Sequence, residues 1–359
     1  MFERRVATNF DWTLFWLTYA IALVGIVNLV SASRPDAVRQ LQWLVIGSVL
    51  MVVFLVVHYH FIGRAAYFGY AVVLAMLACV LLFGRSGGGA QRWLPLGPVA
   101  VQPSEFAKLA VIVVLARWFS RDGRGDKPLG LVDLVVPGLL AGVPTLMVMK
   151  QPDLGTALII FFIFCAMVAI HGIRLKALLL IVGTGLAASP VVWRHLKPYQ
   201  RSRLLTFMNP EADPQGTGYH ILQSKIAIGS GRLFGKGFTE GTQSQLQFLP
   251  EHHTDFAFAV WGEEWGFLGA FLLLLLYFVL ILWGLNIALK AKDRLGTLLA
   301  YGITAYLFLH VAINIGMVTG VLPVVGVPLV LMSYGGSSVF TTLACVGLLL
   351  NISMRRYMF

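Results

Sequence analysis

Long apolar runs constrain this chain more than any other feature. Stretches of about 20 apolar residues with few charges, the length that crosses a bilayer as a helix, recur along the whole sequence. They lie at residues 13–32, 39–57, 65–83, 104–120, 131–149, 154–170, 175–193, 256–289, 297–320 and 325–351. Charged residues make up only 12% of the chain, against about 25% in a soluble domain.

Hydrocarbon cannot satisfy an exposed backbone polar group, and the alternating pattern of a barrel strand is absent, so each run must be a helix. The sequence therefore predicts an all-α fold, a polytopic membrane bundle of about ten helices. We expect this bundle to form a single integral membrane domain over residues 1–359. The first run has no small-residue cleavage site, so we expect a retained helix and not a removed signal peptide.

The loops on the side of the N-terminus hold far more Lys and Arg than the short loops of the other side, which predicts that both termini are cytoplasmic. The net charge of +11 is then mainly a topology signal, and it suits the anionic headgroups of the bilayer. No basic stripe interleaved with aromatic residues appears, so we expect no nucleic-acid partner. Three cysteines inside apolar runs are interpreted as small core hydrophobes: Cys79, Cys165 and Cys345.

One long polar segment, residues 194–255, separates the seventh and eighth runs. The predicted topology makes it an extracytoplasmic loop, away from ATP. Within it, the apolar spacing over 219–228 predicts a short amphipathic helix on the membrane surface. The glycine-rich residues 229–237 fail both the Walker and the dinucleotide patterns, so they predict a flexible turn. Residues 86–89, Ser-Gly-Gly-Gly, predict a plain linker in another outer loop.

Two outer loops lead back into the membrane through similar sequence motifs, Gln102-Pro103-Ser104-Glu105 and Gln151-Pro152-Asp153. Proline suits the first turn of a helix, and an acid just after it caps free N–H groups. Helix capping is therefore one interpretation of Asp153. Both helix starts also direct positive dipole ends outward, where they favour an anionic group such as a phosphate.

Glu105 and Lys108 are three residues apart, on one helical face and about one turn into the membrane. Ionisable residues at this depth are costly and usually face a polar cavity or each other. A structural ion pair and a pair that lines a substrate site both fit this spacing. Asp255 enters the eighth run from the same outer side, so we expect it to share one outward-facing site with Glu105, Lys108 and Asp153.

The sequence Glu251-His252-His253-Thr254-Asp255 raises the question of a metal site. Successive residues rarely point at one ion, and no second histidine cluster lies outside the membrane, so we expect no zinc site built by the protein. A loosely held Mg²⁺ or Mn²⁺ shared with a phosphate ligand stays open. Glu263 and Glu264, two turns further on, fit either a polar face of the bundle or a hydrogen-bonded shell around the site.

The C-terminal part carries a family signature: Asn314, Gly320, Pro323 and Gly326, then Ser333-Tyr334-Gly335-Gly336-Ser337-Ser338. Residues 218–231 and 243–256 match the same family, as do both Gln-Pro helix starts. On these motifs, which span nearly the whole chain, it resembles the SEDS family (shape, elongation, division and sporulation). The approach Gln-Leu-Gln-Phe-Leu before Pro250 is closer to the elongation members than to the division members. One departure is the stretch Val99-Ala100-Val101 before Gln102, where many relatives carry an arginine.

The resemblance implies a peptidoglycan glycosyltransferase of the bacterial cytoplasmic membrane. Such an enzyme polymerises lipid II on the outer face and works with a class B penicillin-binding protein that crosslinks the strands. Asp255 matches the family's essential loop aspartate, and Glu105, Lys108 and Asp153 match polar residues near its outer cavity. We expect further substrate contacts from Gln102, Ser104, Arg201, Arg203, Lys225 and Glu251.

Lipid II already carries its activating pyrophosphate, so the reaction needs no nucleotide, and no cofactor is expected beyond an optional divalent cation. Asp255 would be the general base on the acceptor 4-hydroxyl, in a single inverting displacement that forms a β-1,4 linkage. Helix N-termini, Lys108 or a loop cation would stabilise the departing pyrophosphate. The alternatives are a lipid II flippase, although transporters usually place polar sites near the midplane, and a scaffold for the crosslinking enzyme.

Overall fold

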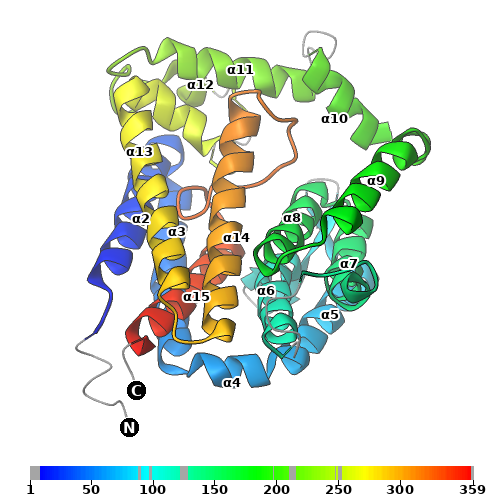
Figure 1. Cartoon of the computed structure of the whole chain (residues 1–359). Coiled ribbons are helices and arrows are strands. Elements are labelled where there is room, and N and C mark those ends of the chain that lie inside the picture. Colours follow the sequence, from blue (N-terminus) through cyan, green and yellow to red (C-terminus); the bar gives the residue numbers. More distant parts are fainter. Residues whose placement is uncertain are drawn as a thin grey trace.

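The computed structural model describes residues 9–87, 90–96, 99–121, 128–196, 198–209, 216–246, 248–249 and 253–356. Within them the chain forms a bundle of long helices (Figure 1). These are α2 (Trp12–Ala32), α3 (Arg34–Val56), α5 (Ala66–Phe83), α6 (Pro103–Arg121), α7 (Val135–Lys150), α8 (Leu154–His171), α9 (Leu175–His195), α13 (Ala257–Leu289), α14 (Arg294–Val318) and α15 (Gly336–Arg355). Each predicted run overlaps one of them, which confirms the helical membrane fold.

Within the described residues, eight helices are long and apolar enough to cross a membrane. The other two long helices are α6, which carries charged residues near both ends, and α9, whose apolar stretch Leu175–Val191 is shorter. Every side chain of α9 from residue 178 to 191 is exposed, whereas α15 is buried along nearly its whole length. An apolar exterior around a buried central helix identifies a multi-pass membrane protein.

Short helices close the two ends of the bundle (Figure 1). At the end where α2 begins and α15 finishes lies α4 (Tyr59–Arg64), while η1 (Val132–Leu134) precedes α7. The opposite end holds α10 (Pro198–Met208), α11 (Thr217–Ser230) and α12 (Thr242–Gln245). The predicted helix over 219–228 lies within α11. It is anchored on the bundle, because Oγ of Ser224 donates to the carbonyl oxygen of Val318 in α14 over 2.7 Å.

A small antiparallel sheet precedes α6 and was not predicted. Its strands, in the order β1-β2-β3, are β1 (Arg85–Gly87), β2 (Ala90–Leu96) and β3 (Val99–Val101). The plain-linker interpretation of 86–89 is therefore wrong, since Gly87 pairs with Ala90. Strands this short show no period-2 pattern in the sequence. Leu94 lies opposite Val101, so the hairpin delivers Gln102 to the start of α6.

The glycine-rich segment 231–237 fills a break in α13. The break is at Gly266, where φ is 64° and ψ is −162°, and four main-chain hydrogen bonds hold the segment in it. The N–H groups of Lys236 and Gly237 donate to the carbonyl oxygens of Glu263 (3.0 Å) and Glu264 (3.1 Å). In return, the N–H groups of Phe267 and Leu268 donate to the carbonyl oxygens of Arg232 (2.8 Å) and Leu233 (3.1 Å). The segment does turn, but the prediction that it is flexible is wrong.

The side chains of Glu263 and Glu264 anchor the outer segments to α13. The carboxylate of Glu263 is fully buried and accepts from Nζ of Lys236 at 2.6 Å, from Oγ1 of Thr242 at 3.1 Å and from the N–H of Gln243 at 3.1 Å. Glu264 accepts from Oγ of Ser31. Glu263 therefore joins the glycine-rich segment and the start of α12, from which the chain leads toward Asp255.

The tenth predicted run is wrong over its first residues. Residues 325–335 are not helical, and α15 begins only at Gly336. We call residues 323–335 the core segment, because they cross the interior of the bundle and are mostly buried. Pro323 and Pro328 have no N–H to donate, and Gly326 has a φ of 72°, so a helix cannot form through this stretch.

Side chains from neighbouring helices replace the main-chain hydrogen bonds that the core segment lacks. The hydroxyl of Tyr277 donates to the carbonyl of Val330 at 2.6 Å, and Nε2 of Gln40 donates to the carbonyl of Ser333 at 2.9 Å. Buried carbonyl groups without donors would cost several kcal/mol each in an apolar interior. These distant donors thus fix the path of the segment.

Candidate functional site

Asp255 lies just before α13, and its loop is fixed on two sides. The carbonyl oxygen of His253 accepts a hydrogen bond from the N–H of Tyr334 in the core segment, over 2.9 Å. The ring of Phe256 stacks on His220 of α11, with centroids 5.9 Å apart and planes at 16°. The Asp255 side chain itself is partly buried. The loop therefore holds this carboxylate at the edge of the apolar core.

Asn314 and Gly326 set the position of Asp255. Nδ2 of Asn314 donates to the main-chain carbonyl of Asp255 at 2.8 Å and to that of Val327 at 2.7 Å. The Asp255 carboxylate lies against Gly326, where an added Cβ would be 3.3 Å from Oδ2. Glycine at 326 thus serves two purposes: it takes the left-handed φ at no steric cost, and it leaves room for the carboxylate.

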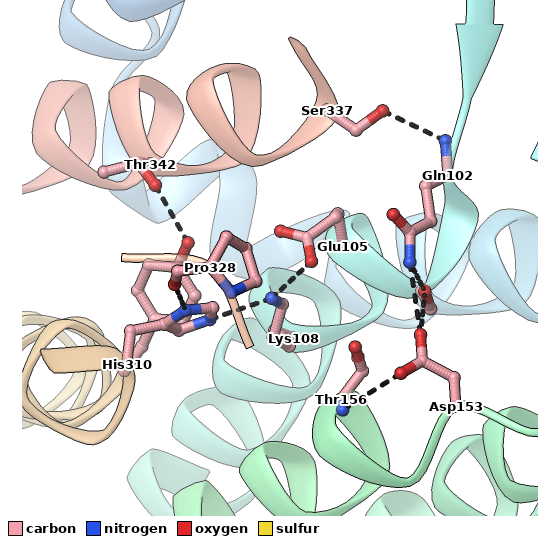
Figure 2. A network of polar contacts seen from close by, with 11 residues as sticks. Gln102, Glu105, Lys108, Asp153, Thr156, His310, Pro328, Ser337 and Thr342 are labelled. Atoms are coloured by element: carbon pink, nitrogen blue, oxygen red, sulfur yellow. Dashed lines mark hydrogen bonds and ion pairs between the residues drawn. The ribbon is translucent and has the colours of Figure 1, made fainter. Parts of the chain in front are cut away.

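The starts of α6 and α8 lie side by side (Figure 2). Nε2 of Gln102 donates to Oδ2 of Asp153 at 3.1 Å, and Oγ of Ser104 donates to the same oxygen at 3.4 Å. The other oxygen, Oδ1, accepts from the N–H of Thr156 at 3.3 Å. Helix capping by Asp153 is therefore confirmed, and the same carboxylate also binds α6.

Lys108 is wholly buried between Glu105 and His310 (Figure 2). Its Nζ lies 2.7 Å from Oε1 of Glu105 and 2.9 Å from Nε2 of His310. Nδ1 of His310 is 3.0 Å from the carbonyl oxygen of Pro328, so Nδ1 carries the hydrogen and Nε2 accepts from the ammonium group. Oε2 of Glu105 is buried and has no hydrogen-bond donor among the described residues.

These parts meet on successive residues of the core segment. Gly326 lies against Asp255, Val327 is bound by Asn314, and Pro328 is bound by His310. The start of α8 packs on the same stretch, since a Cβ on its Gly155 would lie only 2.6 Å from the carbonyl of Val325. The residues expected at one outward-facing site thus gather around one short stretch of chain. Their roles as base and substrate contacts stay predictions.

The loop cations proposed from the sequence have other contacts. Arg201 donates from Nε to the carbonyl of Trp193 at 3.0 Å and from Nη2 to that of Arg194 at 2.6 Å, so it caps the end of α9. Lys225 is exposed on α11, with its Cε against Gly320 at the end of α14. Neither contacts Glu105, Lys108 or Asp153. Arg203 lies on α10 with Arg201, and Glu251 lies outside the described residues.

Three further residues belong to the site and were not predicted there. His310 is an ionisable residue inside an apolar run, four residues before Asn314 on the same helical face, and that position is the signal for it. Arg92 of β2 donates from Nη2 to the carbonyl of Pro152 at 2.5 Å; in the sequence it is only one charge of a loop. Ser337 accepts from the N–H of Gln102 at 3.0 Å (Figure 2).

Comparison with known sequences gives matches over the full length. The model of a family described as cell cycle protein, FtsW/RodA/SpoVE, matches residues 9–358. The peptidoglycan glycosyltransferase MrdB of Escherichia coli K12 is 42% identical over 354 residues, which are 98% of this chain and 95% of that protein. The peptidoglycan glycosyltransferase RodA of Treponema pallidum is 31% identical, over 98% of this chain and 99% of that protein.

Solved structures agree. One chain, from a study of the coordination of polymerization and crosslinking by a peptidoglycan synthase complex, superposes with a TM-score of 0.85 at 34% identity, covering 98% of this chain and 99% of that one. The rod shape determining protein RodA of Thermus thermophilus has a TM-score of 0.73 at 31% identity, covering 98% of each chain. The chain therefore belongs to the FtsW/RodA/SpoVE family, the shape, elongation, division and sporulation proteins that its motifs resemble.

Proposed function

We propose that this chain is a peptidoglycan glycosyltransferase that polymerises lipid II into β-1,4 glycan strands during cell elongation. The observation that carries the proposal is the arrangement around the core segment. The Asp255 carboxylate lies against Gly326. Two residues further along the core segment, His310 contacts the carbonyl of Pro328 and also Lys108, so it links Lys108 to the same stretch. The candidate base Asp255 and the buried cation Lys108 are thus both positioned by the core segment. Relatives named as peptidoglycan glycosyltransferases, MrdB and RodA, support the same activity.

Asp255 suits the role of general base, because Asn314 fixes its main chain. The carboxylate accepts the proton of the acceptor 4-hydroxyl as that oxygen attacks C1 of the donor sugar. The bond from C1 to the pyrophosphate oxygen breaks on the opposite face, so the α-linked donor yields a β linkage by inversion. Undecaprenyl pyrophosphate leaves with the bonding electrons. A placed base of this kind contributes about 10²–10⁴ in rate.

The departing pyrophosphate needs hydrogen-bond donors. Lys108 already serves Glu105 and His310, so the geometry favours Arg92 and the N–H groups at the starts of α6 and α8. Nε of Arg92 is buried without an acceptor among the described residues. In the sheet, Arg92 is two residues before Leu94, which pairs with Val101 at the end of β3.

Other polar groups would orient the sugar. Oε2 of Glu105 offers a buried acceptor to a substrate hydroxyl or amide group, and Asp153 holds Gln102 and Ser104 in place beside it. We keep Arg203, Lys225 and Glu251 as candidate substrate contacts. The contacts of Arg201 at the end of α9 favour a structural role for it instead.

A divalent cation, Mg²⁺ or Mn²⁺, would assist the departure of pyrophosphate if the substrate brings one. In the part of the chain that the structure describes, no group of three His, Cys, Asp or Glu side chains is placed to hold a metal ion. These residues therefore do not fit a metal site built by the protein, and we derive no step through the ion.

We place the site at the outer face of the cytoplasmic membrane, with both termini cytoplasmic. The helices α10 to α12 lie opposite the end where α2 begins and α15 finishes (Figure 1). The latter end carries Arg64, Arg117 and Arg121, as expected for the inner side. A class B penicillin-binding protein is the partner we propose, because a structural neighbour comes from a complex that coordinates polymerization with crosslinking.

The test is lipid II polymerisation by the purified protein, alone and with a class B partner, followed by gel separation of the glycan strands. Asp255→Ala is compared with the parent. Asp36→Ala is the matched control, because Asp36 is an acid in the first turn of α3 whose polar partners among the described residues are Ser33 and Arg39. We expect strands from the parent and the control, and none from folded Asp255→Ala.

Strands of parental length from Asp255→Ala would exclude Asp255 as the base. No strands from any combination, together with parent-dependent movement of lipid II across vesicle membranes, would favour the flippase alternative instead.

A further inference from the structure

An apolar groove of about 350 Å³ opens between α3, α4, α5 and α6, and its lining does not include Glu105, Lys108, Asp153 or Asp255. Its wall includes Phe61, Gly69, Val73, Phe106, Ala110 and Val113. Phe61 and Gly69 are exposed, so the groove opens on the lipid-facing side of the bundle. The lining is almost entirely apolar, so the groove offers little that would hold water.

Three arginines gather at one end of the groove. On α6, the groove residues 106, 110 and 113 continue at helical spacing into Arg117 and Arg121, so all five positions share one face. Arg64 ends α4 beside Ala65, which also lines the groove. Arg117 lies within electrostatic range of both Arg64 and Arg121 and of Tyr67. This face of α6 therefore passes from the apolar wall of the groove directly to a cluster of positive charge.

No acid neutralises this cluster within the described residues. Arg64 and Arg121 are exposed and Arg117 is partly buried, and none of the three makes an ion pair there with a carboxylate. Residues 122–127, which follow Arg121, lie outside the described part of the chain. Like charges held this close repel one another, and a bound phosphate would remove that repulsion. Guanidinium groups suit a phosphate because they bind its oxygens in pairs.

We propose that Arg64, Arg117 and Arg121 bind the phosphate of an anionic phospholipid whose acyl chain lies in the groove above them. The occupant is a lipid of the surrounding bilayer, since charge and apolar wall are continuous and both face outward from the helices. Basic pockets between transmembrane helices are a recurring form of lipid headgroup site. Arg117 and Arg121 lie near the end of α6, whereas Glu105 and Lys108 lie near its start.

The first experiment titrates the delipidated full-length protein with phosphatidylglycerol or phosphatidylcholine of the same acyl chains, and counts bound lipid by native mass spectrometry. The parent is compared with the triple variant Arg64→Gln, Arg117→Gln, Arg121→Gln. The matched control removes three exposed charges elsewhere: Lys176→Gln, Lys290→Gln, Lys292→Gln. We expect the first triple variant to lose about 100-fold in affinity for phosphatidylglycerol, roughly fivefold per arginine. The control keeps its affinity.

A second pair of variants tests the acyl chain without touching charge. A Cβ added at Gly69 meets nothing within 4 Å, so Gly69→Leu fills the groove without a clash, and Gly138→Leu on α7 is the control because Gly138 is equally open. We expect Gly69→Leu to weaken phosphatidylglycerol binding and Gly138→Leu to leave it unchanged.

Three results would overturn the proposal. Equal binding of phosphatidylcholine and phosphatidylglycerol, or equal losses in the two charge variants, would exclude a site for anionic headgroups. If inorganic phosphate displaces the lipid completely and Gly69→Leu binds like the parent, the arginines bind a free anion and the groove plays no part.

Discussion

The side-chain amide of Asn314 donates to the main-chain carbonyl of Asp255 over 2.8 Å, and the same nitrogen donates to Val327 over 2.7 Å. One asparagine therefore fixes the candidate base relative to the core segment. In Asn314→Leu both carbonyl groups lose a donor, so we expect a loss of about 1–3 kcal/mol in the free energy of unfolding. Because the carboxylate is then misplaced, we expect kcat in lipid II polymerisation to fall about 10²-fold.

The control for this variant is Asn351→Leu. Asn351 is also buried and donates to three main-chain carbonyls, those of Phe54, Leu55 and Val57, but it lies far along α15 from the site. It should lose as much thermal stability in detergent as Asn314→Leu and keep its kcat. Equal losses of kcat in the two variants would mean that stability alone, and not the position of Asp255, explains the effect.

Gly326→Ala tests whether the carboxylate needs the space that glycine leaves. The φ of 72° costs an alanine roughly 1–2 kcal/mol, and the added Cβ would lie 3.3 Å from Oδ2 of Asp255. We expect lower stability and a fall in kcat of about tenfold. Gly172→Ala is the matched control, since its φ is 95° and its Cβ would meet nothing closer than 3.9 Å. A parental kcat in folded Gly326→Ala would contradict the proposed contact.

The helices could be predicted because an apolar run in hydrocarbon has few alternatives. The run 154–170, for example, became α8, Leu154–His171. The non-helical path of the core segment could not be predicted, since its residues Val324, Val325, Val327 and Leu329 are as apolar as those of the membrane helices. Its path depends on donors that lie far away in the sequence, such as Gln40 and Tyr277, and a hydropathy pattern does not contain these contacts.

Part of the site was predictable for the same reason. Alternate crossings of the membrane bring the starts of α6, α8 and α13 to one end, so Glu105, Asp153 and Asp255 were expected together. The contact between Lys108 and His310 joins α6 to α14, and only the packing of these helices creates it. Arg201 shows the opposite case, because a cation in the right loop is used to cap α9.

Substitutions in the buried pair of Glu105 and Lys108 can distinguish a structural role of this pair from a role in substrate binding. Removing one partner leaves an uncompensated charge, so Lys108→Met should cost about 3–5 kcal/mol in the free energy of unfolding. In Glu105→Met with Lys108→Met both charges are gone, and we expect a coupling of about 1–3 kcal/mol in a double-mutant cycle. Thermal unfolding in detergent measures the stabilities, and lipid II polymerisation measures activity.

The double variant decides between the two interpretations. If the pair contacts substrate, the double variant regains stability and stays inactive. Activity that returns together with stability would show that the pair is only structural.

Lys236 and Glu263 provide the last prediction, which concerns the loop before Asp255. When Lys236 is changed to Met, the donors that remain for the buried Glu263 carboxylate among the described residues are the neutral groups of Thr242 and Gln243. We therefore expect a loss of about 1.5–3 kcal/mol in stability. Segment 231–249 should then detach from the break in α13 and be cleaved faster by protease. Lys290→Met, at the far end of the same helix, is the control and should change neither property. Parental melting and parental cleavage of Lys236→Met would mean that the main-chain hydrogen bonds in the break, and not this ion pair, anchor the loop.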